Sequence, residues 1–124
     1  MFTKTATPDE LDALVRKYRR NLVNSQLEHL ILSYLEEQSL CGYDIISIVH
    51  DRFHVLLSPG QVYPAIDYLV DHGLVTKEGG ERRVLLCLTH SGRELLRAWR
   101  NELSSIQLQL RYQGSVREDV AISG

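Results

Sequence analysis

The sequence predicts a mainly α-helical protein with one small β-hairpin, in the order of a winged helix-turn-helix with an added helix at each end. Two observations predict this fold class. Apolar residues recur at helical spacing in five segments of the chain. Between the fourth and fifth of these segments, two strand-like stretches flank a glycine-containing turn.

Composition limits the size and the chemistry of the protein. The chain has 124 residues, of which 44% are hydrophobic and 24% are charged, so one domain with a sizeable core is expected. Lys and Arg total 14 against 16 Asp and Glu, which gives a net charge of -2. Nucleic-acid binding would therefore depend on local placement of positive charge rather than on bulk attraction.

Several classes of protein are excluded by what the sequence lacks. The longest strongly apolar run, residues 84–88, is far too short to span a bilayer. The first residues do not have the pattern of a signal peptide. Cys41 and Cys87 are far apart within apolar stretches, which favours small buried side chains over a disulfide or a metal site. We expect a cytoplasmic protein with no cofactor, no metal and no membrane partner.

The first 24 residues predict an N-terminal helical extension. Thr7 fits the N-cap, Pro8 the first helical position and Glu10 the capping box of a helix that ends near Leu22. One face of this helix is apolar and is expected to be buried. The residues of that face are Leu11, Leu14, Val15, Tyr18 and Leu22.

A basic cluster lies opposite this apolar face. It consists of Arg16, Lys17, Arg19 and Arg20. For any one of them a solvated helix face is the simpler interpretation, and the role of the cluster stays open.

Residues 25–89 predict the winged-helix domain. A second helix is expected to open at Ser25 with Glu28 as its capping partner, and a third begins near Gly42. In the fourth helix Ser58 fits the N-cap.

The fourth helix contains a proline and is followed by the hairpin. Pro64 lies close enough to the helix start to be tolerated, and Gly73 fits a left-handed C-terminal cap. Strands are expected over 74–77 and 82–88, with residues 78–80 forming the turn.

The last helix is expected to serve dimerisation. Thr89 caps it, it occupies 90–113, and residues 114–124 after its stop at Gly114 are expected to form a flexible tail. Its apolar residues follow 3, 4 spacing for about two heptads, which is typical of a seam between two subunits. The seam residues are Leu96, Trp99, Leu103, Ile106 and Leu110.

Three motifs, in order along the chain, resemble those of the PadR family of winged-helix transcriptional regulators. LCGYDI at 40–45 is similar to the family's L-H-G-Y-E-I, and SPGQVYPAIDYLVDHGLV at 58–75 resembles its recognition-helix motif. LTHSG at 88–92 matches its L-T-x-x-G junction. The resemblance covers about residues 25–110, and the single terminal helix resembles the shorter subfamily. It implies a homodimer, joined through the C-terminal helices, that binds operator DNA and usually represses transcription.

The predicted recognition helix has four candidate DNA contacts near its start. Ser58 and Gly60 leave the helix N-terminus open to a phosphate. Gln61 suits an adenine edge, and Tyr63 suits a phosphate or a thymine methyl, with a partly buried position in the core as the equal alternative.

Positive charge near this helix comes from the predicted wing. Lys77, Arg82 and Arg83 are expected to contact phosphates or the minor groove. The recognition helix, by contrast, carries Asp67 and Asp71 and contains no Lys or Arg. Of the family's R-K-Y-Y run before L-T, this sequence keeps only the arginine. We expect narrow specificity that depends on the wing, with modest non-specific affinity.

Alternatives stay open for other residues. Trp99 is an interface anchor or, as in drug-responsive PadR members, a stacking partner for a planar small-molecule effector. His50 and His54 are four apart, but an ordinary histidine pair is favoured over a metal site. No catalytic pattern is evident, so we expect a regulator and not an enzyme. A winged-helix protein-interaction module is the rival, because the recognition helix is acidic.

Overall fold

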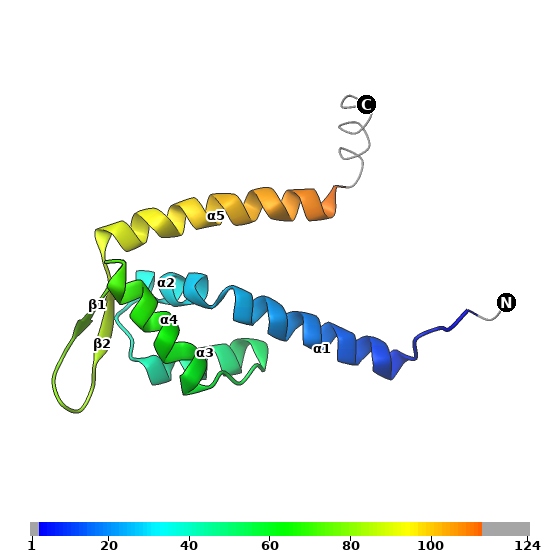
Figure 1. Cartoon of the computed structure of the whole chain (residues 1–124), viewed down its shortest axis with the longest axis horizontal. Helices are drawn as coiled ribbons and strands as arrows, with labels where there is room; N and C mark the ends of the chain where they lie inside the picture. The colour runs from blue at the N-terminus through cyan, green and yellow to red at the C-terminus, as the bar shows by residue number, and fades with distance from the viewer. Residues whose placement is uncertain (1–2, 113–124) are drawn as a thin grey trace, which may run out of the picture.

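The computed structural model describes residues 3–112, which form five helices and one antiparallel hairpin (Figure 1). The predicted fold class is confirmed. The elements in chain order are α1 (Pro8–Ser25), α2 (Leu27–Glu37), α3 (Gly42–Phe53), α4 (Pro59–Asp71), β1 (Val75–Glu78), β2 (Leu85–Leu88) and α5 (His90–Arg111).

The core lies between α2, α3, α4, the hairpin and the first half of α5. Its largest fully buried side chains are Ile31, Leu32, Ile45, Val49, Leu57, Val62, Ile66, Leu69, Val75 and Leu96. On the rim, the Arg100 guanidinium of α5 donates to both carboxylate oxygens of Glu36 in α2, at 2.9 and 3.2 Å. The beginning of α5 is therefore part of the winged-helix domain rather than a free appendage.

The hairpin is shorter than predicted, and its loop is longer. Val75 pairs with Leu88 and Glu78 with Leu85, so Glu78 belongs to the strand and the loop spans 79–84. Gly79 has φ +114°, and a Cβ there would collide with the carbonyl oxygen of Arg83. The loop therefore needs glycine at this position.

Helix boundaries differ from prediction at one place. α1 continues through Ser25, whose hydroxyl donates to the Leu22 carbonyl at 2.9 Å within the same helix. Ser25 therefore does not cap α2. The N-cap of α2 is Gln26, whose side chain makes no capping hydrogen bond. The caps at Thr7 and Thr89 are as predicted, since they accept from the backbone N–H of Glu10 at 3.2 Å and of Gly92 at 3.0 Å.

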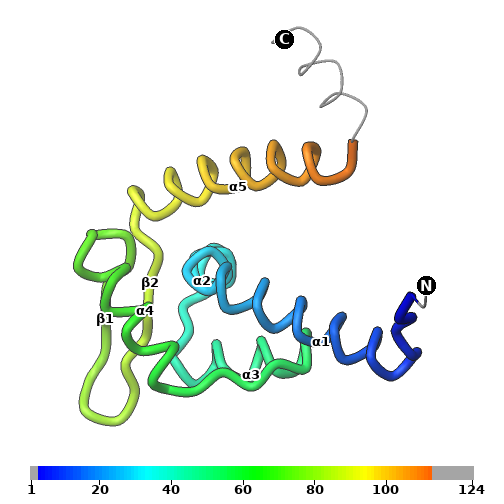
Figure 2. The backbone as a smooth tube through the Cα atoms, turned by 45° about the vertical axis from the view of Figure 1, so that its right-hand side comes forward, coloured from blue at the N-terminus to red at the C-terminus, as the bar shows by residue number. Residues whose placement is uncertain are grey.

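α1 and α5 both extend from the same side of the winged-helix domain and lie apart over most of their length (Figures 1 and 2). The prediction that the apolar face of α1 is buried is wrong for the single chain. Leu14 is 57% exposed and Tyr18 is 65% exposed, and only Val23, outside that face, is buried. Helical spacing identified the apolar face but not what covers it.

α5 ends at Arg111 in the described part of the chain. The predicted stop at Gly114 and the predicted flexible tail over 114–124 lie outside the described residues. No helix within residues 3–112 is both long enough and apolar enough to cross a membrane.

Candidate nucleic-acid interface

The start of α4 is closed by a reciprocal cap. Gln61 Oε1 accepts from the backbone N–H of Ser58 at 3.0 Å and from its hydroxyl at 3.2 Å. Gln61 Nε2 donates to Oδ1 of Asn24, at the end of α1, at 3.4 Å. The side chain predicted to read an adenine edge is therefore engaged in capping. The Ser-x-x-Gln spacing of a capping box was the signal for this role.

Two of the sequence motifs meet at Tyr63 and Gly42. A Cβ at Gly42 would lie 2.9 Å from ring atom Cε1 of Tyr63, so a larger residue there would push the ring away from its present place on the start of α3. Tyr63 is still 40% exposed. The ring is thus partly packed, as one interpretation has it, while its exposed part leaves the DNA contact of Tyr63 as a prediction.

The outward face of α4 carries two acidic residues, and the helix contains no Lys or Arg. The helix buries Val62, Ala65, Ile66 and Leu69. The opposite face carries Gly60, Pro64, Asp67 and Asp71, all exposed. The pattern of burial thus points the two carboxylates away from the core.

Two of the three predicted wing cations already have acidic partners. Lys77 Nζ lies 3.1 Å from Asp67 Oδ1, and Arg83 Nη2 lies 2.8 Å from Asp44 Oδ2. Arg82 is exposed and makes no ion pair within residues 3–112. Because the paired groups are substantially exposed, a DNA phosphate could displace either carboxylate at modest cost.

Asp44 joins the start of α3 to the wing. Its Oδ2 accepts from the backbone N–H of Cys41 at 3.0 Å, from the Cys41 thiol at 3.1 Å and from Arg83. The Cys41 backbone bond first, then the thiol and Arg83, hold the pKa of Asp44 below its ordinary range. This carboxylate is missed by the sequence analysis, although Cys41 and Asp44 have capping-box spacing.

The two cysteines are half-buried free thiols rather than fully buried hydrophobes. Cys41 bonds Asp44, and Cys87 Sγ lies 3.1 Å from the Ser39 hydroxyl. His54 caps α3 in the left-handed conformation, with φ 56°. Residues 3–112 contain no group of three His, Cys, Asp or Glu placed to hold a metal ion.

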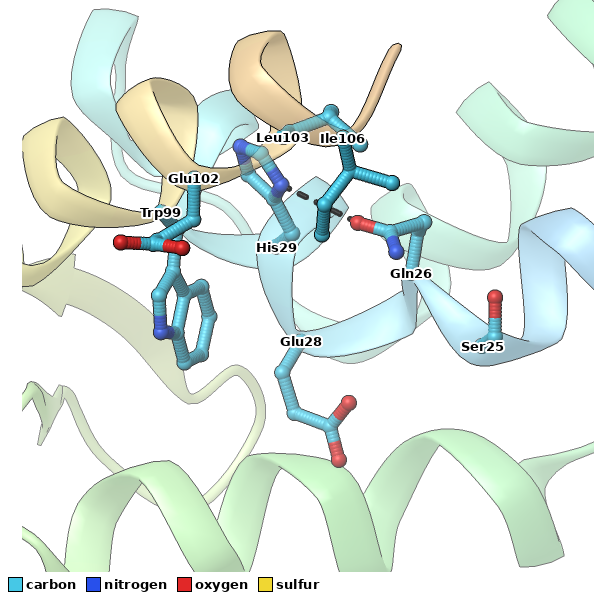
Figure 3. A pocket seen from close by; sticks show the side chains of 8 residues that line it. All are labelled: Ser25, Gln26, Glu28, His29, Trp99, Glu102, Leu103 and Ile106. Carbon is cyan, nitrogen blue, oxygen red and sulfur yellow. Dashed lines mark hydrogen bonds between the residues drawn. The ribbon is translucent and has the colours of Figure 1, made fainter. Parts of the chain in front are cut away.

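Trp99 lies in a hollow of about 270 Å³ between α2 and α5 (Figure 3). Its ring meets that of His29 edge-on, with centroids 5.9 Å apart, and His29 Nδ1 lies 3.2 Å from Gln26 Oε1. Burial, and then the charge of Arg100, lower the pKa of His29. The hollow is lined by Ser25, Gln26, Glu28, His29, Trp99, Glu102, Leu103 and Ile106.

The predicted subunit seam divides into two parts. Leu96 is fully buried within its own chain and is not available to a partner, because it packs in the core. Trp99 and Leu103 are half-buried, whereas Ile106 is 55% exposed and Leu110 is 70% exposed. A seam between subunits, if it follows this helix, begins later than predicted.

Comparison with known proteins places this geometry in a family. Residues 31–98, more than half of the chain, match the family model described as the transcriptional regulator PadR-like family. Among curated proteins, the transcriptional regulator YqjI of Escherichia coli (strain K12) is 27% identical over 93 residues. The match covers 71% of this chain and 44% of YqjI, so the chain spans less than half of that relative.

Solved structures share the fold. A transcriptional regulator from Clostridium thermocellum superposes with TM-score 0.68 at 19% identity, over 73% of this chain and 92% of that one. A PadR family transcription regulator from Clostridium difficile R20291 gives 0.63 at 25% identity, over 72% and 99%. Bacillus subtilis PadR, solved in complex with operator DNA, gives 0.55 at 29% identity, over 59% and 46%.

The family match and the observed fold confirm two predictions, the resemblance to PadR proteins and the assignment to regulators rather than enzymes. The motifs that carried the resemblance form the start of α3, the whole of α4 and the junction into α5. The chain therefore belongs to the PadR-like family of transcriptional regulators.

Proposed function

We propose that this regulator binds a specific inverted-repeat DNA operator as a homodimer and represses transcription. The observation that carries the proposal is the exposure of α4 beside the hairpin wing, outside the buried core. An exposed helix of this kind fits the major groove of B-DNA, and the adjacent wing reaches the backbone. The solved PadR–operator complex of Bacillus subtilis supports the same use.

In this proposal the DNA contacts come from α4 and the wing. Ser58, Gly60 and the exposed side of Tyr63 enter the groove, while Gln61 fixes the helix start and makes at most a secondary base contact. Arg82 binds phosphate directly. Lys77 and Arg83 bind phosphate in place of their carboxylate partners. Because each carboxylate stays nearby, it offsets part of the positive charge that Lys77 or Arg83 offers to DNA.

Dimerisation is proposed through the terminal helices. Residues 25–89 are the proposed DNA-binding unit, and α5 (His90–Arg111) together with α1 is proposed to serve dimerisation. The exposed apolar side chains that a second copy would cover are Leu11, Leu14, Val15, Tyr18, Leu22, Ile106 and Leu110. Exposed apolar faces on two helices are typical of an interaction site, and two-fold symmetry would set the spacing of two half-sites.

Selection of binding sites from fragmented host DNA tests the proposal. Purified protein is incubated with the fragments, and the retained DNA is sequenced. We expect one enriched inverted repeat whose half-sites are about one helical turn apart. Retention of fragments without any shared sequence would contradict specific operator binding, and transcription from the selected promoter with and without the protein distinguishes repression from activation.

A second candidate is a regulator that responds to a planar small molecule through Trp99. The hollow beside Trp99 favours it, although about 270 Å³ is at the small end for a ligand site. Because Trp99 is the only tryptophan, its fluorescence reports the site directly. Planar cationic dyes should quench it at micromolar concentration, and unchanged emission would exclude such a pocket.

A further inference from the structure

α1 carries a basic face whose direction is fixed by three of its residues. Leu22 lines a hollow shared with Leu103 of α5, and Val23 packs into the core. The next residue, Asn24, bonds Gln61 at the start of α4. α1 therefore turns one side toward α5 and another toward the exposed end of α4.

The side that meets α4 is positively charged. Residues four and seven positions before Asn24 share its face of the helix, and these are Arg20 and Lys17. They lie about 6 and about 10 Å from Asn24 along the helix axis. Arg19, by contrast, lines the hollow toward α5 with Leu22, so the four basic residues do not form one face opposite the apolar one.

α1 and the wing flank α4 on opposite sides. Tyr63 lines a hollow with the wing residues Arg82 and Arg83, whereas Gln61 lines another with Asn24. Figure 1 shows the same arrangement, with the hairpin on one side of α4 and α1 on the other. A duplex lying against α4 would therefore have one backbone near the wing and the other near the end of α1.

Within residues 3–112, the cations on this face have no acidic partner, unlike Lys77 and Arg83 of the wing. Lys77 and Arg83 have carboxylate partners, but Lys17 and Arg20 are exposed and have no ion pair within the described residues. The acidic residues of α1, Asp9 and Glu10 in its first turn among them, lie toward the other end of the helix. Because α4 itself supplies no positive charge, cations beside it that have no acidic partner in the described part of the chain are suited to bind the DNA phosphates. Phosphate contacts supply most non-specific affinity.

We propose that Lys17 and Arg20 form a second DNA-binding surface, which holds the phosphate backbone on the side of α4 away from the wing. This surface rests on the proposed DNA-binding function. It lies outside residues 31–98, the part of the chain that matches the family model. It also locates positive charge that the net charge of -2 conceals.

The salt dependence of DNA affinity tests the surface. The variants Lys17→Gln, Arg20→Gln and their combination are compared with Arg19→Gln, which removes the same charge from the side facing α5. Binding to a fluorescein-labelled mixed-sequence duplex is measured by anisotropy between about 50 and about 200 mM salt, where each phosphate contact contributes about threefold. Each substitution removes one contact from both subunits of the proposed dimer, so the loss of affinity over that range should be about tenfold smaller for each single variant and about a hundredfold smaller for the double variant.

Arg19→Gln should keep the wild-type salt slope. Circular dichroism and light scattering should match wild type for all variants, because the substituted side chains are exposed. Wild-type slopes in the double variant, or an equal effect of Arg19→Gln, would overturn the α1 surface while the DNA-binding function stands. Absence of salt-sensitive binding by the wild-type protein would overturn the function and the surface together.

Discussion

The winged-helix part of the chain and its two terminal segments have the same kind of apolar spacing but opposite burial. In α2, Ile31, Leu32 and Leu35 are buried against α4, α5 and the hairpin. In α1, which directly precedes α2, residues at the same spacing lie in the open, as do Ile106 and Leu110 late in α5. A single chain therefore covers the apolar face of α2, whereas it leaves the apolar faces of α1 and of late α5 uncovered, and these are the faces through which we propose dimerisation.

The largest effect on dimerisation is expected when negative charge is introduced into the exposed half of α5. The double variant Ile106→Asp with Leu110→Asp should be monomeric, as measured by light scattering. It should also lose operator binding, because each monomer then binds its half-site alone. Leu108→Asp is the matched control, since Leu108 is also exposed but lies on another face of α5. A double variant that stays dimeric would show that this half of α5 is not the interface.

Charge on the apolar face of α1 should weaken the dimer less. Leu14→Asp should raise the dimer dissociation constant at least about tenfold, because burial of a leucine contributes about 1.5–3 kcal/mol. Ala13→Asp places the same charge on the neighbouring, non-apolar face and should leave the dimer unchanged. Equal dissociation constants for the two variants, measured by sedimentation, would remove α1 from the interface.

A change in the wing should separate DNA binding from dimerisation. Arg83→Ala should weaken operator binding about tenfold, since a charge-assisted phosphate contact is lost. The dimer mass and the melting temperature should be unchanged, because the pair with Asp44 is exposed and contributes little to stability. Unaltered operator affinity would mean that Arg83 serves only to hold Asp44.

The smallest effect concerns the junction of the two regions, where His29 of α2 meets Trp99 of α5. Burial lowers the pKa of His29 below its ordinary 6.5, so its contribution to stability is present above pH 6.5 and is lost as the pH falls through the lowered value. Trp99 emission should change with a midpoint below 6.5, and His29→Gln should remove that transition while His90→Gln keeps it. A midpoint at or above 6.5 would contradict the packing seen here.

The sequence predicts the parts of the fold that depend on local chemistry. Thr7, Ser58 and Thr89 cap helices as expected, and Gly73 has the predicted left-handed conformation, with φ 71°. Ser25 fails as a cap because its hydroxyl bonds its own helix instead.

The candidate site is less predictable because its contacts join distant parts of the chain. The residue types at the wing are evident from the sequence, but the pairing of Arg83 with Asp44 spans 39 positions. The bond between Asn24 and Gln61 spans 37 positions and changes the role expected for Gln61. Periodicity gave no sign that Leu96 packs inside the chain while Leu110, on the same stripe, does not.

The salt dependence of DNA affinity in the wild-type protein is the decisive test of whether this regulator binds DNA specifically. Anisotropy titrations of the selected operator should show log affinity falling linearly with log salt, with a slope of several units that reflects the phosphates neutralised by two subunits. Affinity for the operator should exceed that for a mixed-sequence duplex at every salt concentration. A flat salt response, or equal affinity for both duplexes, would contradict a sequence-specific DNA-binding regulator and favour the protein-interaction module.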